Sequence, residues 1–319
     1  MPEKGQAMHT LITVLRGQGN NLALKDGEVA PRGYTLKFTE VPVIVDAFRR
    51  MVRGLEFDVC EMAMTTYLCA KAYGKPFTAL PVFLVRGFHH GAIVRGANVP
   101  LRPKDLNGRR VGVNRGYTVT TGVWVRGILA DEYGLDLNSV TWVRSGDEHV
   151  AEYRPPSNVV SMPAHATLDG LLGSGDLAAA IGVDGAGQDV APLIPDAAAA
   201  GFAALTGRGH YPINHLVVVK DELLGAHPEL AAELFHAFSE AKVRYVDRLR
   251  HYETEAPNAT DRMYQQVMQL TGRDPLPYGI APNRAVIEEL IRHAMSQGIL
   301  DRRPKLESLF ADGTRELEG

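Results

Sequence analysis

The chain has 319 residues, of which 45% are apolar and 22% are charged, and its formal net charge is −3 at pH 7. This length and apolar content allow a large core and favour two domains over one very large domain. The small net charge, without a run of Lys or Arg, argues against a nucleic-acid partner. The two cysteines, Cys60 and Cys69, lack the spacing of a zinc site or a disulfide framework, which is typical of a reducing compartment.

The first residues of the chain contain no apolar core of signal-peptide length. No run of the sequence approaches the ~18 consecutive apolar residues of a membrane span. We therefore expect a cytoplasmic protein without a membrane partner.

The first part of the chain alternates between strand-like and helix-like patterns. Residues 11–15 predict a strand that leads into a polar loop beginning at Arg16, residues 34–41 alternate like a half-buried strand, and residues 44–54 have helical spacing. Ligands of open α/β sheets gather where strands end and helices begin. Arg16 is therefore a candidate for ligand contact.

Residues 57–67 repeat this arrangement with more polar side chains. An apolar strand over 57–60 precedes Glu61, and a helix opens near Thr65 and Thr66, whose hydroxyls suit a helix cap. Free backbone N–H groups at a helix start attract anions, so the stretch predicts a binding site. An ordinary strand-to-helix turn with a threonine cap is the alternative.

A histidine pair lies between the next two predicted strands, residues 79–85 and 91–94. Arg86, His89 and His90 stand in this connection. Histidine suits proton transfer because its ordinary pKa is near neutral pH. The pair is therefore a candidate for acid–base chemistry.

Residues 101–113 predict the entrance to a second domain, a polar linker followed by a strand. The strand ends in a polar cluster before a new helix, and the cluster comprises Arg115, Tyr117, Thr118, Thr120 and Thr121. These donors exceed the need of one helix cap, which favours an anion site with Arg115 as a carboxylate partner. A capping cluster alone is the alternative.

The rest of the chain carries fewer candidates. Residues 148–156 are polar and are expected to face mostly solvent, whereas Asn214 and His215 open a long strand over 211–220. His215 has two interpretations, a site residue or a satisfied histidine at a hinge. Residues 228–249 and 282–297 predict amphipathic helices that serve packing.

Together these patterns predict an α/β protein of two lobes with a ligand cleft between them. The chain crosses to the second lobe near residues 93–104 and returns near 215–220, so lobe 1 comprises residues 1–98 plus 216–319 and lobe 2 comprises 99–215. The two polar helix starts, one in each lobe, then face each other across the cleft and close on a small anion.

Five blocks carry a resemblance to a known family: residues 58–63, 86–93, 117–124, 147–150 and 211–215. In combination they resemble the 4,5-dihydroxyphthalate decarboxylase family. The resemblance implies a two-lobed type II periplasmic-binding-protein-like fold and conversion of 4,5-dihydroxyphthalate to protocatechuate and carbon dioxide. It implies a small aromatic dicarboxylate as partner and no organic cofactor, and a homo-oligomer is compatible with it.

Loss of carbon dioxide from an aromatic ring requires a proton at the carbon that carries the carboxylate. We expect His89 or His90 to supply this proton, with Glu61 or His215 acting on the phenol para to it. The guanidinium and hydroxyl groups are expected to hold the carboxylates. The substrate-binding set predicted in this way is Arg16, Thr65, Arg86, Arg115, Tyr117, Thr118, Thr120, Thr121 and Asn214.

Three other readings are open. His89, His90, His215 and Glu61 have the chemistry of a transition-metal site, but adjacent histidines point to opposite faces of a strand, so no metal is predicted. A binding protein for an aromatic acid explains the fold and the anion sites but not the absence of an export signal. A cofactor-free biosynthetic enzyme, as in the thiamine-pyrimidine synthase relatives, lacks a motif here.

Overall fold

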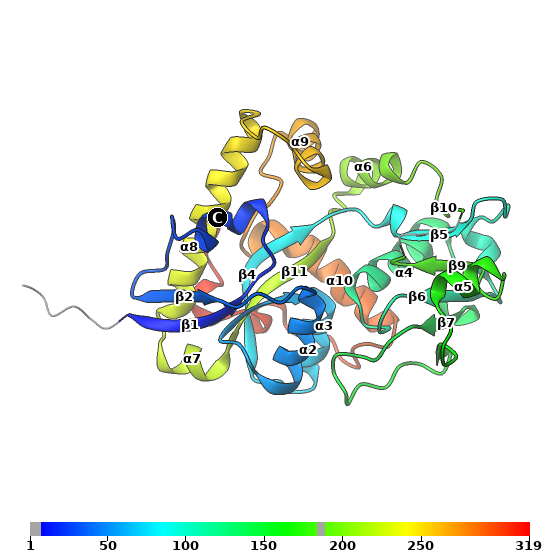
Figure 1. The fold of residues 1–319 in the computed structure, drawn as a ribbon, viewed down its shortest axis with the longest axis horizontal. Helices are drawn as coiled ribbons and strands as arrows, with labels where there is room; N and C mark the ends of the chain where they lie inside the picture. The colour runs from blue at the N-terminus through cyan, green and yellow to red at the C-terminus, as the bar shows by residue number, and fades with distance from the viewer. Residues whose placement is uncertain (1–7, 184–188) are drawn as a thin grey trace, which may run out of the picture.

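The computed structural model describes residues 8–183 and 189–319, and its strands form two separate sheets (Figure 1). The first sheet has five strands in the order β2-β1-β3-β11-β4. β1 is parallel to β2 and β3, while β11 runs antiparallel to both of its neighbours. The strands are β1 (His9–Val14), β2 (Tyr34–Phe38), β3 (Val59–Ala63), β4 (Phe77–Arg86) and β11 (Ile213–Lys220).

The second sheet has six strands in the order β10-β5-β9-β6-β7-β8. Its β9, β6, β7 and β8 are parallel, and β5 is antiparallel to β9 and β10. The strands are β5 (Ile93–Gly96), β6 (Arg110–Val113), β7 (Thr141–Arg144), β8 (Val159–Ser161), β9 (Ala179–Ile181) and β10 (Val190–Pro192). Both sheets thus place parallel strand ends at an edge, which is where α/β proteins bind ligands.

Helices cover both sheets, and α10 lies between the two halves in Figure 1. The helix over residues 44–54, predicted from its apolar spacing, has those bounds in the structure, with Ala47, Phe48 and Met51 buried. The α-helices are α1 (Leu22–Lys25), α2 (Ile44–Gly54), α3 (Met64–Ala72), α4 (Thr120–Tyr133), α5 (Leu168–Gly173), α6 (Ala197–Arg208), α7 (Asp221–Ala226), α8 (Leu230–Arg250), α9 (Ala259–Thr271) and α10 (Arg284–Ser296).

Two short segments connect the sheets, residues 87–92 and 209–212. They lie side by side, because the backbone N–H of Gly87 donates to the carbonyl of Pro212 at 3.2 Å. β5 belongs to the second sheet and the whole of β11 to the first. The crossings therefore precede the predicted boundaries at 98/99 and 215/216 by a few residues.

The local start of α3 differs from the prediction. The helix begins at Met64 after an extended Ala63, and no side chain caps it. Thr65 and Thr66 consequently lie inside the first turn, where their hydroxyls are available to partners from elsewhere in the chain. Within the described residues, no helix combines the length and the apolar character that a membrane span requires.

Candidate active site

A cleft of about 320 Å³ is lined by residues from both sheets and from the helices and loops next to them. The first sheet and its helices contribute Arg16, Pro42, Val43, Ile44, Val45, Phe48, Ala63, Thr66, Asn214 and His215. The second contributes Arg115, Val119, Thr120, Thr121 and His149. The lining combines apolar side chains with charged and polar ones, which suits a planar ring with charged substituents.

His215 is held by a buried carboxylate. Its Nδ1 lies 2.6 Å from Oε1 of Glu61, on the adjacent strand β3, whose side chain is fully buried. The other carboxylate oxygen accepts the backbone N–H of Arg16 at 2.9 Å. Glu61 is therefore fixed on both oxygens, and it orients the imidazole so that Nε2 is the nitrogen left for the cleft.

Arg16 and Arg115 line the cleft from the two sheets. Arg16 follows β1, and Arg115 follows β6 with a left-handed backbone at φ 68°. Their guanidinium groups make no hydrogen bond or ion pair with another described residue. A non-glycine residue in this conformation is uncommon and is often found at functional sites. The two unpaired cations give the cleft affinity for anions.

The start of α4 adds neutral donors beside Arg115. Thr120 and Thr121 occupy its first turn and line the cleft, and no side chain caps the helix. Free N–H groups at a helix start bind anions. Across the cleft, Asn214 accepts the Nε2–H of His89 at 2.7 Å. His89 is therefore a residue that orients Asn214 from behind.

His149 lines the same cleft, although residues 148–156 were expected to face mostly solvent. Glu148, His149, Val150 and Tyr153 are buried instead. Burial, and then the positive charges of Arg49, Arg115 and Arg53, lower the pKa of His149 to about 4. The cleft thus contains a histidine that is neutral at neutral pH.

The ring of Phe48 contacts both histidines of the cleft. Its edge-to-face contacts have centroid distances of 5.1 Å to His215 and 6.2 Å to His149. Phe48 was predicted only as a core residue of its helix. The sequence pattern does not distinguish a residue that lines the cleft from a core residue, because both lie on the same apolar face of the helix.

Neither member of the predicted histidine pair lines the cleft, so this geometry gives no support to the expectation that one of them donates the proton directly. His89 lies behind Asn214, and burial lowers its pKa to about 4. His90 is fully buried, and its Nε2 lies 3.0 Å from Oε2 of Glu132 on α4. Because His90 lies in the turn after the crossing, its ring points to the interface between the halves.

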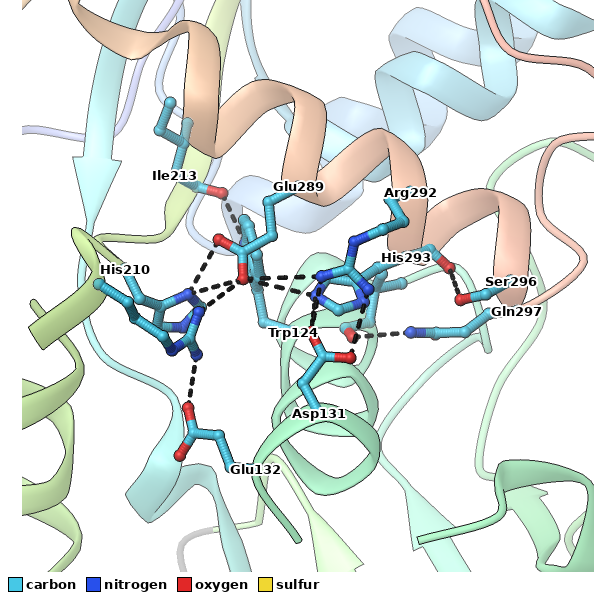
Figure 2. Close-up of polar contacts among 12 residues, drawn as sticks. Trp124, Asp131, Glu132, His210, Ile213, Glu289, Arg292, His293, Ser296 and Gln297 are labelled. Atoms are coloured by element: carbon cyan, nitrogen blue, oxygen red, sulfur yellow. Dashed lines mark hydrogen bonds and ion pairs between the residues drawn. The ribbon is translucent and has the colours of Figure 1, made fainter. Parts of the chain in front are cut away.

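That interface contains a dense charge network (Figure 2). Glu289 on α10 accepts from Arg208 at 2.9 Å and lies 3.1 Å from Nδ1 of His210. Arg292 pairs with Asp131 of α4 at 2.6 Å. Burial raises the pKa of Glu289, but hydrogen bonds from His210 and other partners outweigh it and hold the pKa well below its usual range.

Part of this network has the composition of a metal site. Among the described residues, Asp131, Glu289 and His293 each place one ligand-type atom within 4.8 Å of the others. Both carboxylates, however, already accept from arginines. The arrangement is therefore an ion-pair network that joins α4 and α10.

Four residues of the predicted binding set have structural partners instead of facing the cleft. Arg86 is buried and donates to Asn283 and to the Tyr211 carbonyl. Thr65 donates to the Thr118 carbonyl at 2.7 Å, which joins the two halves. The remaining two, Tyr117 and Thr118, are buried, and both donate their backbone N–H to Glu148.

Comparisons with solved structures place the fold. The periplasmic aliphatic sulphonate binding protein SsuA from Escherichia coli has a TM-score of 0.56 and 13% identity, covering 98% of this chain and 94% of its own. A Candida albicans protein described as having the generic periplasmic binding protein structural fold has a TM-score of 0.54 and 13% identity, covering 93% of this chain and 92% of its own. The chain has the predicted periplasmic-binding-protein-like fold.

Comparisons with known sequences identify the family. No protein-family model matches the chain. The 4,5-dihydroxyphthalate decarboxylase of Comamonas testosteroni is 30% identical over 293 residues, which cover 85% of this chain and 87% of the relative. The enzyme of the same name from Pseudomonas putida is 37% identical over 146 residues, 43% of this chain and 56% of the relative. The chain belongs to the 4,5-dihydroxyphthalate decarboxylase family.

Proposed function

We propose that the chain decarboxylates 4,5-dihydroxyphthalate to protocatechuate and carbon dioxide in the cleft between the two sheets. The observation that carries the proposal is His215, which faces the cleft with buried Glu61 on its Nδ1 at 2.6 Å. The carboxylate orients the imidazole so that Nε2 faces the cleft, where it can transfer a proton. A protein that only binds an anion has no need of this proton donor.

Arg16 and Arg115 are the proposed partners of the two carboxylates. One cation approaches from each half of the molecule, and neither has a carboxylate partner among the described residues. Thr121 adds a hydroxyl and the start of α4 adds free N–H groups, whereas the Thr120 hydroxyl is bonded to Thr65. Charge-assisted hydrogen bonds of this kind are about twice as strong as neutral ones.

The proposed reaction transfers one proton to a ring carbon. The phenolate para to the leaving carboxylate pushes its electrons through the ring, and the carbon that bears the carboxylate takes the proton from Nε2 of His215. The bond from this carbon to the carboxylate then breaks, and its electron pair restores the aromatic ring. Carbon dioxide leaves, the ring oxygen is again a phenolate, and a proton from solvent restores His215.

The apolar wall supports the bond-breaking step. Val43, Ile44, Val45 and Phe48 are the apolar side chains of the lining that form this wall. A carboxylate that loses its charge as carbon dioxide leaves is favoured where water is excluded. We infer that the leaving carboxylate lies between its arginine and this wall, and that the retained carboxylate lies against the other arginine.

The test is incubation of the purified protein with 4,5-dihydroxyphthalate. We expect carbon dioxide and protocatechuate in equal amounts. Gas detection measures the carbon dioxide, and chromatography measures the protocatechuate. Phthalate, which lacks both ring hydroxyls, is the control and should bind without turnover. Tight binding of 4,5-dihydroxyphthalate without product would instead favour a binding protein for uptake or sensing of aromatic acids.

Two expectations from the sequence remain predictions. A cytoplasmic location stays a prediction, and residues 1–7 lie outside the described part. A homo-oligomer is compatible with the sequence and stays untested.

A further inference from the structure

His149 is the second imidazole of the cleft, and the proposed reaction leaves it without a role. Its ring contacts Phe48, as the ring of His215 does. Its Nδ1 is 3.0 Å from the Thr66 hydroxyl, and its Nε2 makes no hydrogen bond within residues 8–183 and 189–319. A nitrogen in a ligand cleft without a protein partner is available to the ligand.

The contact with Thr66 indicates which nitrogen carries the proton. The Thr66 side chain is buried, and His149 is its one hydrogen-bond partner among the described residues. If His149 donated from Nδ1, the buried hydroxyl hydrogen would have no acceptor, which costs about 1–3 kcal/mol. The favoured arrangement has Thr66 donating to Nδ1, so that Nε2 carries the hydrogen toward the cleft.

The backbone of His149 is held from both halves of the molecule. Arg53 of α2 donates to the carbonyls of His149 at 3.1 Å and Glu148 at 2.8 Å. The Glu148 carboxylate in turn accepts the hydroxyl of Thr118 at 2.8 Å. At Gly116, a Cβ atom would lie 2.6 Å from Glu148, so this close approach requires glycine. The Nε2–H group therefore has a fixed position.

The charges around the two histidines differ in sign. His215 has the carboxylate of Glu61 at its ring, whereas the surroundings of His149 include Arg49, Arg53 and Arg115. Positive surroundings disfavour an imidazolium and favour an anionic ligand oxygen. Two titratable groups with opposite surroundings are the usual basis for dividing acid and donor roles in a site.

We propose that His149 is a neutral hydrogen-bond donor whose Nε2–H binds the ionised ring hydroxyl of the substrate, while His215 supplies the proton. The inference rests on the proposed function, since it assigns a residue to the ring oxygen of that reaction. It adds a substrate requirement: a ring oxygen that ionises. The phenolate is formed by loss of its proton to solvent, and the nearby arginines stabilise it.

The test uses two substitutions of His149. Their side-chain amides reach the positions of different ring nitrogens. In His149→Gln the side-chain amide reaches the position of Nε2, whereas in His149→Asn it reaches only that of Nδ1. The probe is protocatechuate, whose catechol absorption shifts to longer wavelength when a hydroxyl ionises. We expect wild type and His149→Gln to show the ionised spectrum of the bound catechol, and His149→Asn to show the neutral one.

Turnover of 4,5-dihydroxyphthalate should follow the spectrum. Loss of a single hydrogen-bond donor typically lowers the rate by roughly 10²–10³-fold. We therefore expect the kcat of His149→Asn to fall by at least roughly 10²-fold. His149→Gln should retain most of the wild-type kcat. Thr66→Ser should behave like wild type, and Thr66→Val, which removes the donor to Nδ1, should reduce the ionised fraction.

Three results separate the outcomes. An ionised catechol in His149→Asn would overturn the role of His149, even if turnover falls. Equal turnover in wild type, His149→Gln and His149→Asn would also overturn it. If wild type ionises bound protocatechuate but releases no carbon dioxide from 4,5-dihydroxyphthalate, the proposed function fails, and the spectra of the variants still decide whether His149 binds the ring oxygen.

Discussion

Three histidines at or near the cleft differ in what lies behind each ring. His215 contacts a buried carboxylate, His149 contacts a threonine hydroxyl, and His89 donates to the amide oxygen of Asn214. The same type of side chain therefore suits three roles, the proposed proton donor, the proposed neutral donor and a group that orients Asn214. Its partner decides which, and the partner comes from a distant part of the chain.

The buried histidines make the stability of the protein depend on pH. Burial is the largest cause that lowers the pKa of both His89 and His149 to about 4, from an ordinary value of 6.5. Between these values the unfolded chain binds more protons than the folded protein, so stability is full above about pH 6.5 and falls toward pH 4. Each shift is worth up to about 3 kcal/mol.

Urea unfolding at about pH 7.5 and about pH 5 measures this effect. We expect wild type to lose stability at the lower pH and the double variant His89→Gln, His149→Gln to lose much less. His227→Gln, at a half-buried position outside the cleft, is the control and should keep the wild-type dependence. An unchanged pH dependence in the double variant would contradict the assignment.

Sequence patterns predicted cleft residues that lie near the ends of strands or at the start of a helix. Arg16, Arg115, Thr120, Asn214 and His215 all line the cleft, as expected from these positions. Their contact with substrate stays a prediction. The pattern failed where a role depends on a partner distant in the sequence.

His90 and His149 illustrate the failure. Spacing could not show that Glu132 pairs with His90 at the interface between the halves. Nor could it show that Arg53 of α2 draws the segment around His149 into the protein. His149 does occur in one of the five blocks that carry the family resemblance, and that was the signal for it.

At the scale of elements, local patterns placed most helices and strands well. α2 has its predicted bounds, and the apolar face of α8 is buried as its helical spacing indicated. The strand β3 extends to Ala63, so Glu61 lies inside the strand instead of after it. A buried glutamate at a strand position contradicts the usual propensities, and the reason is its pairing with His215.

The network between α4 and α10 should contribute measurably to stability. Glu289→Gln keeps the side-chain shape but removes the charge that Arg208 and His210 contact. Hydrogen bonds to charged groups are worth about 1.5–3 kcal/mol, so we expect a loss of about 1–3 kcal/mol in the free energy of unfolding.

Glu288 on the same helix is the matched control. Its pairs with Arg284 and Arg303 are more exposed, with distances of 3.8 and 3.9 Å. Surface pairs of this kind contribute about 0–1 kcal/mol. Denaturant unfolding of Glu289→Gln and Glu288→Gln should therefore separate them, and equal stability of the two variants would show that the network contributes little.

For the whole molecule, the arrangement follows from a discontinuous first half. The chain leaves the first sheet after β4 and returns as β11, which inserts between β3 and β4. This insertion brings His215 beside Glu61, which is 154 positions away in the sequence. Contacts such as that of Thr65 with Thr118 then join the two halves around the cleft. The active-site pairing is thus a product of the topology.

The most direct test of the account compares His215→Gln with His90→Gln. Carbon dioxide release and calorimetric binding of 4,5-dihydroxyphthalate are measured for both variants and for wild type. Proton donation is typically worth roughly 10²–10⁴-fold in rate, so His215→Gln should lose this much turnover while still binding the substrate. His90→Gln, away from the cleft, should retain wild-type turnover. Full turnover by His215→Gln would contradict the account.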